Sequence, residues 1–301
     1  MKAFRSSESV LLNRVKTRVS VPRGSRLTHG IGDDCAIFRP RGGTEDLLFT
    51  TDLLLEDVHF RRKTHAAGDV GHKALARGLS DIAAMGGEPR FCLLSLAIPR
   101  WANEAWVDGF FRGFLALGEK TATPLAGGDL ARADRFACDV VVCGAAPCGK
   151  ALLRSGARPG DRIYVSGELG GAAYRLENGK RDPRLEPRLA LGRFLRESGA
   201  TAAMDLSDGL SIDLARLCTA SRVSANITVP PIFRHASIEQ ALHGGEDYEL
   251  LFTMPPRRHL PEQFQGLRLS YIGVIQKGRI GAVFVDGKRL QALGFDHFQH
   301  T

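Results

Sequence analysis

Apolar residues in the first half of the chain recur at spacings that alternate between those of strands and those of helices. From residue 71 to residue 85, Leu75, Leu79 and Ile82 lie three or four positions apart, which predicts a helix that ends at the following glycine pair. A second amphipathic helix is predicted over residues 104–120. Strands are predicted over residues 46–52, continuing in extended form over 53–60, and over residues 91–98 and 136–145.

The alternation of strand and helix patterns resumes after a turn-rich stretch at residues 147–160, where we expect a domain boundary. Asp286 and Gly287 predict a hairpin turn near the end of the chain. We therefore predict an α+β protein of two domains, residues 1–147 and 148–301. Strands of the second half are expected at 162–166, 202–206, 248–253, 267–275 and 282–285, and helices at 171–177, 187–198 and 210–221.

The composition is that of a globular protein with room for two cores. The chain has 301 residues, of which 44% are hydrophobic and 25% charged, and no repeat is evident. The first fifteen residues hold basic side chains but no apolar stretch of the length that a signal peptide needs. The longest apolar runs are too short to span a bilayer. We therefore expect a cytoplasmic protein with no membrane partner.

A net charge of +8 indicates an anionic partner, either nucleic acid or phosphorylated metabolites. The arginines are scattered along the chain, and only 7% of residues are aromatic, which disfavours a surface on which bases stack. A nucleic-acid-binding protein would show binding that weakens steeply with salt. Phosphate-rich small molecules explain the charge at least as well, and we expect no nucleic-acid partner.

Six cysteines are present, and none forms a C-x-x-C pair. Cys138 and Cys143 are an odd number of positions apart in a predicted strand, so they lie on opposite faces and cannot hold one metal ion together. We therefore expect buried free thiols.

Residues 144–150 read GAAPCGK, which has the spacing of a phosphate-binding Walker A loop. Ala151 follows this segment and lacks the hydroxyl that would hold Mg²⁺, and Pro147 lies inside it. The residues that follow favour a strand over a helix. We interpret the segment as a connecting turn.

Acidic residues recur beside glycine or inside apolar runs, and we interpret them as carboxylates held mainly on glycine-rich turns. Asp81 is informative because Ile82 and two alanines follow it directly, and a carboxylate there is costly unless it is paired or binds a metal ion. Glycine lets backbone N–H groups approach a phosphate closely, and several carboxylates suit Mg²⁺. The six segments are Gly32-Asp33-Asp34, Thr50-Thr51-Asp52, Ser80-Asp81, Gly127-Gly128-Asp129, residues 205–209 and Gly244-Gly245-Glu246-Asp247.

Each of these residues also has an ordinary structural interpretation. An aspartate near glycine is often a turn or a helix cap, so Asp33 and Asp34 can be one cap and one ligand, and Asp208 can cap the helix that follows it. His59 stands between apolar residues, where a structural role is common. Arg154 can bind a phosphate or lie at the surface. Six acidic sites together favour a multi-metal site for polyphosphates.

In this order the motifs closely resemble those of the thiamine-monophosphate kinase family, within the aminoimidazole-ribonucleotide-synthetase-like superfamily. The resemblance covers nearly the whole chain. It is carried by Gly30-Ile31-Gly32-Asp33-Asp34, Thr51-Asp52 with His59-Phe60, Lys73-Ala74-Leu75-Ala76 leading to LSDIAAMG, Gly127-Gly128-Asp129, Arg154-Ser155-Gly156-Ala157, DLSDGL, GGEDYEL and the terminal GFDHF.

The resemblance implies two α/β domains of the aminoimidazole-ribonucleotide-synthetase-like type, with the amino-terminal sheets pairing across a homodimer. Residues 1–147 would bind metal and ATP and form the dimer, and residues 148–301 would complete the ATP and thiamine-phosphate sites. By motif position, the ligands of several Mg²⁺ ions would be Asp34, Thr50, Thr51, Asp52, Asp81, Asp129, Asp205 and Asp208. ATP would contact Gly128, Asp129, Arg154 and Ser207, and the thiamine-phosphate pocket would contain His59, Glu246 and Phe295.

Some positions depart from the family pattern. Leu130 stands where a small hydroxyl residue is usual, Gly78 where asparagine is common, and Asp57 where glycine is usual. The chain is also compact around residues 178–187. None of these departures removes a principal carboxylate, so they bear on affinity more than on the type of reaction.

The resemblance implies ATP-dependent phosphorylation of thiamine monophosphate to thiamine diphosphate. The attacking phosphate is already an anion at neutral pH, so we expect no general base and no nucleophilic side chain. Mg²⁺ would neutralise charge where two polyanions meet. The alternative within the superfamily is an enzyme that uses ATP to activate an amide oxygen, or to make a selenophosphate, which the absence of a reactive Cys near the amino terminus disfavours.

Overall fold

The computed structural model describes residues 7–22, 24–180, 184–295 and 298, and these form two compact units. We name the units after their helices Ala67–Ala84 (α2) and Leu210–Ser221 (α6). The α2 unit is drawn from residues 34–152 and 175–200, and the α6 unit from residues 1–33, 153–174 and 201–301. Each unit thus takes a segment from the other half of the sequence. The division of function at residues 147 and 148 stays a prediction.

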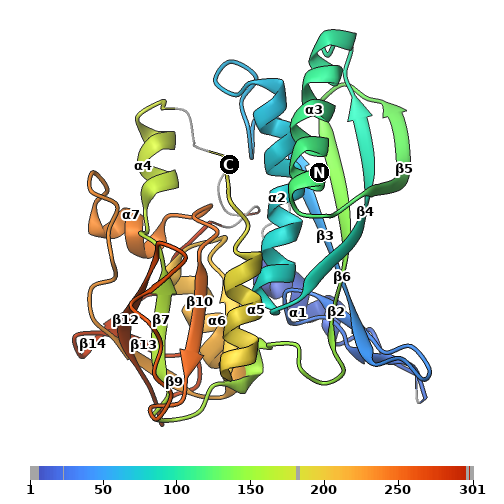
Figure 1. Cartoon of the computed structure of the whole chain (residues 1–301). Coiled ribbons are helices and arrows are strands. Elements are labelled where there is room, and N and C mark those ends of the chain that lie inside the picture. Colours follow the sequence, from blue (N-terminus) through green and yellow to red (C-terminus); the bar gives the residue numbers. More distant parts are fainter. Residues whose placement is uncertain (1–6, 23, 181–183, 296–297, 299–301) are drawn as a thin grey trace. The chain divides into compact units, whose positions relative to one another are not determined.

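The α2 unit contains a sheet with helices against one face (Figure 1). Its strands run in the order β2-β3-β6-β4-β5, antiparallel except for the parallel pair β4 and β5. Along β3 buried and more exposed residues alternate, because successive side chains of a strand point to opposite faces. The elements are β2 (Ala36–Phe38), β3 (Glu45–Leu55), β4 (Glu88–Ile98), β5 (Leu125–Arg132), β6 (Ala137–Pro147), α3 (Glu104–Lys120) and α5 (Leu189–Ser198).

Close packing of α2 against α3 fixes the position of α2. A Cβ atom at Gly71 would come within 2.8 Å of the backbone carbon of Phe110, so only glycine allows this approach. Phe110 is fully buried, and its ring centroid lies 5.5 Å from that of Phe136. The ring centroids of Phe136 and Trp106 are 4.9 Å apart. Aromatic packing of this kind contributes beyond the area it buries, and it fixes α3, against which α2 packs.

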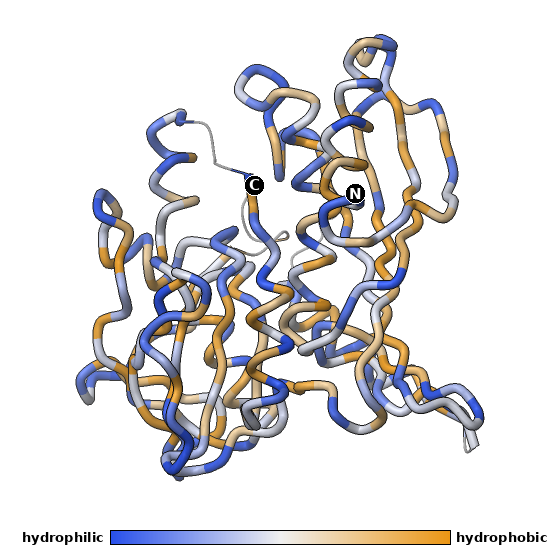
Figure 2. Tube along the Cα trace, viewed as in Figure 1, coloured by the Kyte–Doolittle hydropathy of each residue, from blue (hydrophilic) through white to orange (hydrophobic). Residues whose placement is uncertain are grey.

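The α6 unit contains a second sheet, in the order β14-β13-β9-β12-β7-β10-β8, with β11 paired to β12. Helix α6 packs over this sheet in a core of buried aliphatic residues. Figure 2 shows hydrophobic residues concentrated in the strands and helices of each unit. The elements are β7 (Arg162–Ser166), β8 (Ala202–Asp205), β9 (Ser224–Ile227), β10 (Leu250–Met254), β11 (Gln263–Phe264), β12 (Leu267–Gln276), β13 (Val283–Val285), β14 (Lys288–Leu290), α4 (Gly171–Glu177), α7 (Ile238–His243) and the 3₁₀ turn η1 (Arg154–Gly156).

Most predicted elements are confirmed, and two predictions are wrong. The extended continuation over residues 53–60 ends at Leu55, where the chain turns through Asp57 at a φ of 65°. Asp57 therefore occupies a left-handed backbone position that favours glycine. This backbone conformation explains why glycine is the usual family residue at position 57. Asp129 lies within β5 and not on a turn. The elements that the sequence did not predict include α1 (Glu8–Lys16), β1 (Leu27–His29), β9 and α7.

The segment with Walker A spacing and the six cysteines both have the structures that the sequence predicts. Residues 144–147 are the end of β6, and the N–H of Gly149 in the following turn donates to Asp46 at 2.7 Å, so the segment connects elements as expected. All six cysteines are free; Cys148 is half-buried and the others are buried. Within the described ranges, none of the helices combines the length and hydropathy that a bilayer crossing requires.

Candidate active site

A polar stripe runs along the otherwise buried helix α2. Lys73, Arg77 and Asp81 are four residues apart, so their side chains lie on one face of the helix. Lys73 Nζ donates to the carbonyl oxygen of His59 at 2.9 Å, and Arg77 binds Asp52 at 2.7 Å. Lys73 therefore contacts the backbone of His59 and Arg77 contacts the side chain of Asp52, and the resemblance assigns both of these partners to the site.

Asp81 lies beside Asp34 and Thr50. The hydroxyl of Thr50, on β3, donates to the Asp81 carboxylate. One carboxylate oxygen of Asp34 and one of Asp81 lie within 4.8 Å of each other, and Asp34 is buried. Two carboxylates this close repel each other unless a cation or a proton lies near them. The hard oxygen donors of these three residues fit Mg²⁺.

Asp52 and Thr51 point to opposite faces of β3. Arg77 Nη1 also donates to the carbonyl oxygen of Leu53 at 3.3 Å, so the guanidinium holds both the Asp52 carboxylate and the strand. Thr51 is exposed on the other face, where its hydroxyl donates to Asp139 at 2.6 Å. The structure therefore separates two residues that the sequence places in one metal site, and it adds Asp139 to the open face of the sheet.

Asp129 lies on β5, three strands away from β3 in the sheet. It is exposed and aligned with Ser95, which faces Asp139 on the next strand. Three strand spacings amount to about 14 Å. The structure therefore does not bring Asp129 to the Asp34 and Asp81 pair of the same chain. The neighbouring Gly128 packs directly on the Leu94 backbone, where a Cβ atom would overlap the Leu94 carbonyl oxygen.

The imidazole of His59 is buried and fixed by a local turn. Its Nδ1 accepts a hydrogen bond from the Leu55 N–H at 3.0 Å, and the His59 N–H donates to the Leu55 carbonyl oxygen at 3.0 Å. One ring nitrogen of His59, Nδ1, thus has a structural role, as the ordinary interpretation of this residue expects. Its contact with a substrate stays a prediction.

In the α6 unit, Asp205 is buried at the end of β8, and the loop that follows carries Ser207 and Asp208. Arg216 binds Asp208 and also Asp213, the latter at 2.8 Å. The carboxylate of Asp213 accepts from the N–H groups of Asp208 and Gly209, both at 3.1 Å. The N-cap of α6 is Gly209, so Asp208 is not its cap.

Asp213 is fully buried below this loop. Burial raises the pKa of Asp213 to about 7, the Asp208 carboxylate adds to the rise, and Arg216 opposes it. Neither Asp213 nor Arg216 was predicted as part of the site. The signal that was available for Asp213 is the one that singled out Asp81, an acidic residue in an apolar helix.

Two backbone contacts bring the remaining substrate residues of this unit to the same loop. The N–H of Glu246 donates to the Ser207 carbonyl oxygen at 2.7 Å, and the N–H of Phe295 donates to that of Asp208 at 3.1 Å. Glu246 has a φ of 67°. The unit therefore brings together the segments that carry Ser207, Asp208, Glu246 and Phe295, to which the resemblance assigns ATP, metal and thiamine-phosphate contacts. Residues 296 and 297 of the terminal motif lie outside the described residues.

Arg154 begins the 3₁₀ turn η1, and its backbone binds Asp33. The N–H of Arg154 lies 3.2 Å from one Asp33 oxygen, and Asp33 also binds His29 at 3.3 Å. Asp33 is thus a structural acceptor, as the alternative interpretation of the Asp33 and Asp34 pair expects. The Arg154 side chain is 21% exposed, and its contact with ATP stays a prediction.

The comparisons with known proteins agree with this arrangement. The AIR synthase related protein N-terminal domain matches residues 32–149, and the C-terminal domain of the same family matches residues 158–286. Thiamine-monophosphate kinase of Bacillus subtilis is 33% identical over 90% of this chain and 93% of its own. The enzyme of Escherichia coli K12 is 37% identical over 92% and 94%. The structure of AaThiL complexed with AMPPCP and TMP has a TM-score of 0.85 and 31% identity, over 99% of this chain and 100% of that one.

Proposed function

This chain belongs to the thiamine-monophosphate kinase family, and from that premise we propose that it transfers the γ-phosphoryl group of ATP to thiamine monophosphate. The products are thiamine diphosphate and ADP. The observation that carries the proposal is the match over nearly the whole chain to a kinase structure complexed with AMPPCP and TMP. The carboxylate pair of Asp34 and Asp81 supports it independently, because such a pair suits a cation that binds polyphosphates.

Some residues of the proposed site offer metal ligands, and others orient those ligands. Asp81 on helix α2 and Thr50 on strand β3 offer oxygen ligands, and Asp34 offers another from the loop just before β2. Arg77 orients Asp52, and Arg216 orients Asp208, so both carboxylates are held in place before any ligand arrives. Mg²⁺ held by these residues would neutralise charge on the phosphates and on the group being transferred.

The acceptor phosphate is the nucleophile, and it needs no side chain to remove a proton because it is an anion at neutral pH. The proposed role of the chain is therefore to position two polyanions and to offset their repulsion. Glu246 and Phe295 would line the pocket of the thiamine part, where an aromatic ring stacks on the ligand's rings and a carboxylate faces its positive charge.

Product analysis tests the proposed function. The protein, ATP, Mg²⁺ and thiamine monophosphate are incubated, and the products are separated by ion-exchange chromatography. We expect ADP and thiamine diphosphate in equal amounts, with no free phosphate. ADP with free phosphate and no thiamine diphosphate would instead indicate the amide-activating type of enzyme in the same superfamily.

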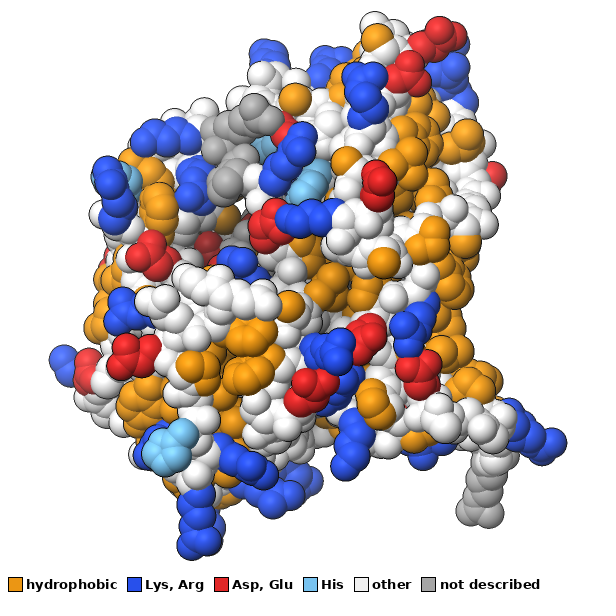
Figure 3. Space-filling model, in the orientation of Figure 1, with side chains coloured by type: hydrophobic (Ala, Val, Ile, Leu, Met, Phe, Trp, Pro, Cys, Tyr) orange, Lys and Arg blue, Asp and Glu red, His pale blue; other side chains and the backbone are white. Residues whose placement is uncertain are grey.

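A homodimer would place Asp129 in the site of a second copy. Within one chain Asp129 lies about 14 Å from β3, and it is exposed on the face of the sheet that the helices leave open. Leu53 and Leu93 lie on this open face and are 50% and 37% exposed. Figure 3 shows hydrophobic side chains gathered along this side of the α2 unit. Exposed apolar side chains on an open sheet face favour association with another sheet.

Subunit complementation tests the contribution of Asp129. Asp81→Asn and Asp129→Asn chains are co-expressed with different tags, and mixed dimers are purified. We expect each homodimer to be nearly inactive and the mixed dimer to recover activity, because one of its two sites holds both native carboxylates. The control pairs Asp34→Asn with Asp81→Asn, which lie in the same chain's group and should show no recovery. A monomer in solution, or no recovery in the first pair, would contradict the proposal.

A further inference from the structure

The hydroxyl of Ser211 lies at the junction of three segments of the α6 unit. Ser211 is fully buried in the first turn of α6. Its Oγ lies 2.8 Å from Nδ1 of His243, the last residue of α7. It also donates to the carbonyl oxygen of Leu293 and accepts from the Leu293 N–H at 3.2 Å. One side chain thus joins α6, α7 and the carboxy-terminal segment.

These contacts use the full hydrogen-bonding capacity of the hydroxyl, which has one donor and two acceptor sites. Because the Leu293 carbonyl can only accept, the hydroxyl proton goes to that oxygen. The Ser211 oxygen then accepts from Leu293 and from His243, which places the proton of the imidazole on Nδ1. No replacement of similar size reproduces all three contacts, and the loss of a buried partner leaves the others unsatisfied.

The segments that Ser211 joins carry both substrate residues of this unit. Leu293 lies two residues before Phe295, and His243 lies three residues before Glu246. At Gly294 a Cβ atom would lie 2.6 Å from the Asp208 carbonyl oxygen and 2.5 Å from Cγ2 of Ile212. The carboxy-terminal segment therefore lies directly on the start of α6, and Phe295 is placed by contacts on both sides of Gly294.

We propose that Ser211 is a positioning residue for thiamine-phosphate specificity. Its hydroxyl fixes the segments of Phe295 and Glu246 against each other and so sets the width of the pocket between them. This inference rests on the proposed function for the identity of the ligand. The fixing of the segments is a property of the chain itself, and it can be measured without substrate.

Hydrogen–deuterium exchange and steady-state kinetics of Ser211→Ala test the proposal together. We expect amides of residues 291–295 to exchange about tenfold faster, because the Leu293 N–H and carbonyl lose their buried partner. The KM for thiamine monophosphate should rise about tenfold, while kcat and the KM for ATP change less than about twofold. Loss of a serine that only stabilises the fold would not raise the KM for thiamine monophosphate while leaving kcat and the KM for ATP nearly unchanged.

Ser224→Ala is the matched control. Ser224 is a buried serine of the same unit, and its hydroxyl donates to the Gln276 carbonyl oxygen at 3.2 Å on the sheet. The control should lose stability through its own broken hydrogen bond but keep the exchange of residues 291–295 and the KM for thiamine monophosphate. Equal exchange and equal KM in Ser211→Ala and the control would overturn the proposal.

Gly294→Ala is the second variant, in case Ser211→Ala does not fold. It keeps the hydroxyl and forces the carboxy-terminal segment away from Ile212 and Asp208. We expect the same rise in KM and in exchange, and unchanged values would count against the proposal. A wild-type protein that forms no thiamine diphosphate would refute the proposed function, whereas the exchange experiment would still decide whether Ser211 fixes the segment.

Discussion

Asp81 and Asp46 are both carboxylates in hydrophobic surroundings, and their partners give them different roles. Asp46 accepts from Arg39 at 2.6 and 2.8 Å and from the Gly149 N–H at 2.7 Å, so its oxygens are well satisfied. Asp81 accepts from Thr50 and lies beside the Asp34 carboxylate. A cation would relieve the repulsion within that pair. At the scale of single residues, these partners make Asp46 a structural carboxylate and support the proposed metal-binding role of Asp81.

Replacing Asp81 by asparagine should lower kcat by about 100-fold or more, because a ligand of the proposed Mg²⁺ is lost where charge develops in the transition state. Without metal, its free energy of unfolding should be equal to or above that of wild type, since the repulsion with Asp34 is removed. Kinase assays and urea unfolding measure the two effects. Asp46→Asn is the control, with a normal kcat and a stability lower by about 1–3 kcal/mol. Near-normal turnover in Asp81→Asn would refute the metal assignment.

Asp46 also predicts a dependence of stability on pH. The hydrogen bond from Arg39 lowers the pKa of Asp46, burial opposes this, and the Gly149 N–H adds to the decrease. A folded-state pKa below the unfolded value means that the stabilisation is present above about pH 3.9 and is lost as the pH falls through the folded-state pKa. The difference in unfolding free energy between wild type and Asp46→Asn should therefore be constant near pH 7 and shrink in acid. A difference that stays the same in urea titrations down to pH 3 would contradict this assignment.

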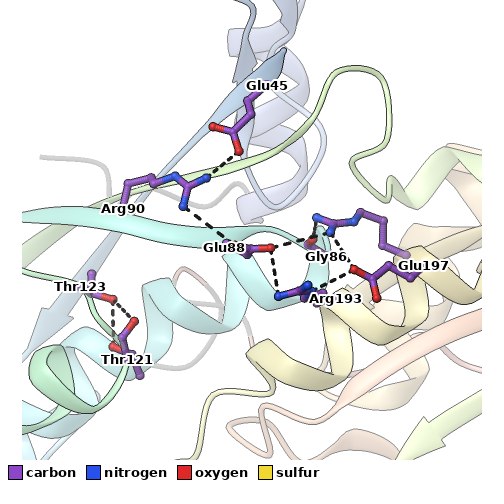
Figure 4. A network of polar contacts seen from close by, with 9 residues as sticks. Glu45, Gly86, Glu88, Arg90, Thr121, Thr123, Arg193 and Glu197 are labelled. Carbon is purple, nitrogen blue, oxygen red and sulfur yellow. Dashed lines mark hydrogen bonds and ion pairs between the residues drawn. The ribbon is translucent and has the colours of Figure 1, made fainter. Parts of the chain in front are cut away.

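Helix α2 is the element that organises the site of its unit, and α5 supports the end of α2. Arg196 of α5 is 8% exposed and donates to the Gly86 carbonyl oxygen at 2.5 Å, just after α2 ends. Arg193 lies on the same helix and is 56% exposed, with ion pairs to Glu197 at 2.9 Å and Glu88 at 3.6 Å (Figure 4). A cation at the carboxy-terminal end of a helix binds carbonyl groups that have no partner within the helix.

These two arginines should differ in their effect on stability. Arg196→Met should lower the free energy of unfolding by about 1–3 kcal/mol, because the buried Gly86 carbonyl loses its donor. Arg193→Met removes exposed ion pairs and should cost less than about 0.5 kcal/mol. Chemical denaturation of both variants measures the difference. Equal losses would show that Arg196 does not support the end of α2.

Local signals in the sequence predict the elements that have strong periodicity or clear stops. Helix α3, α4 and α6 have the predicted bounds, because apolar spacing and flanking turn residues agree there. The GGD segment was interpreted as a turn because its glycines are local turn signals. It lies in β5, whose pairing with β4 is a tertiary contact that no local pattern shows. Gly78 faces Val142 of β6, where a Cβ atom would lie 2.7 Å from Cγ2, so this departure from the family also has a packing reason.

At the scale of the whole molecule, the identity of the acidic residues was predictable but their partners were not. A carboxylate in an apolar context is visible in the sequence, as at Asp81. That Thr50 binds Asp81 while Thr51 binds Asp139 depends on which face of β3 meets α2, and this follows only from the folded sheet. The roles of Arg77 and Arg216 were likewise not predicted, because no local sequence pattern shows that an arginine will pair with a buried carboxylate.

The thiols give a test of how closely both units are packed. Burial raises the pKa of Cys92 to about 11 and that of Cys218 to about 12, so neither forms the reactive thiolate near neutral pH. In the native protein at pH 8, iodoacetamide should modify the half-buried Cys148 first and leave the other five cysteines largely unmodified. Mass spectrometry of native and urea-unfolded samples measures this. Rapid modification of Cys92 or Cys218 would mean that the cores open readily.

Diffraction from crystals of the protein with AMPPCP, thiamine monophosphate and Mn²⁺ in place of Mg²⁺ would test the central claim most directly, because anomalous scattering locates each metal ion. We predict Mn²⁺ bound by Asp34 and Asp81, in contact with the phosphate oxygens of the nucleotide. Metal ions found only at other residues, or phosphates bound without any metal near these two carboxylates, would contradict the account.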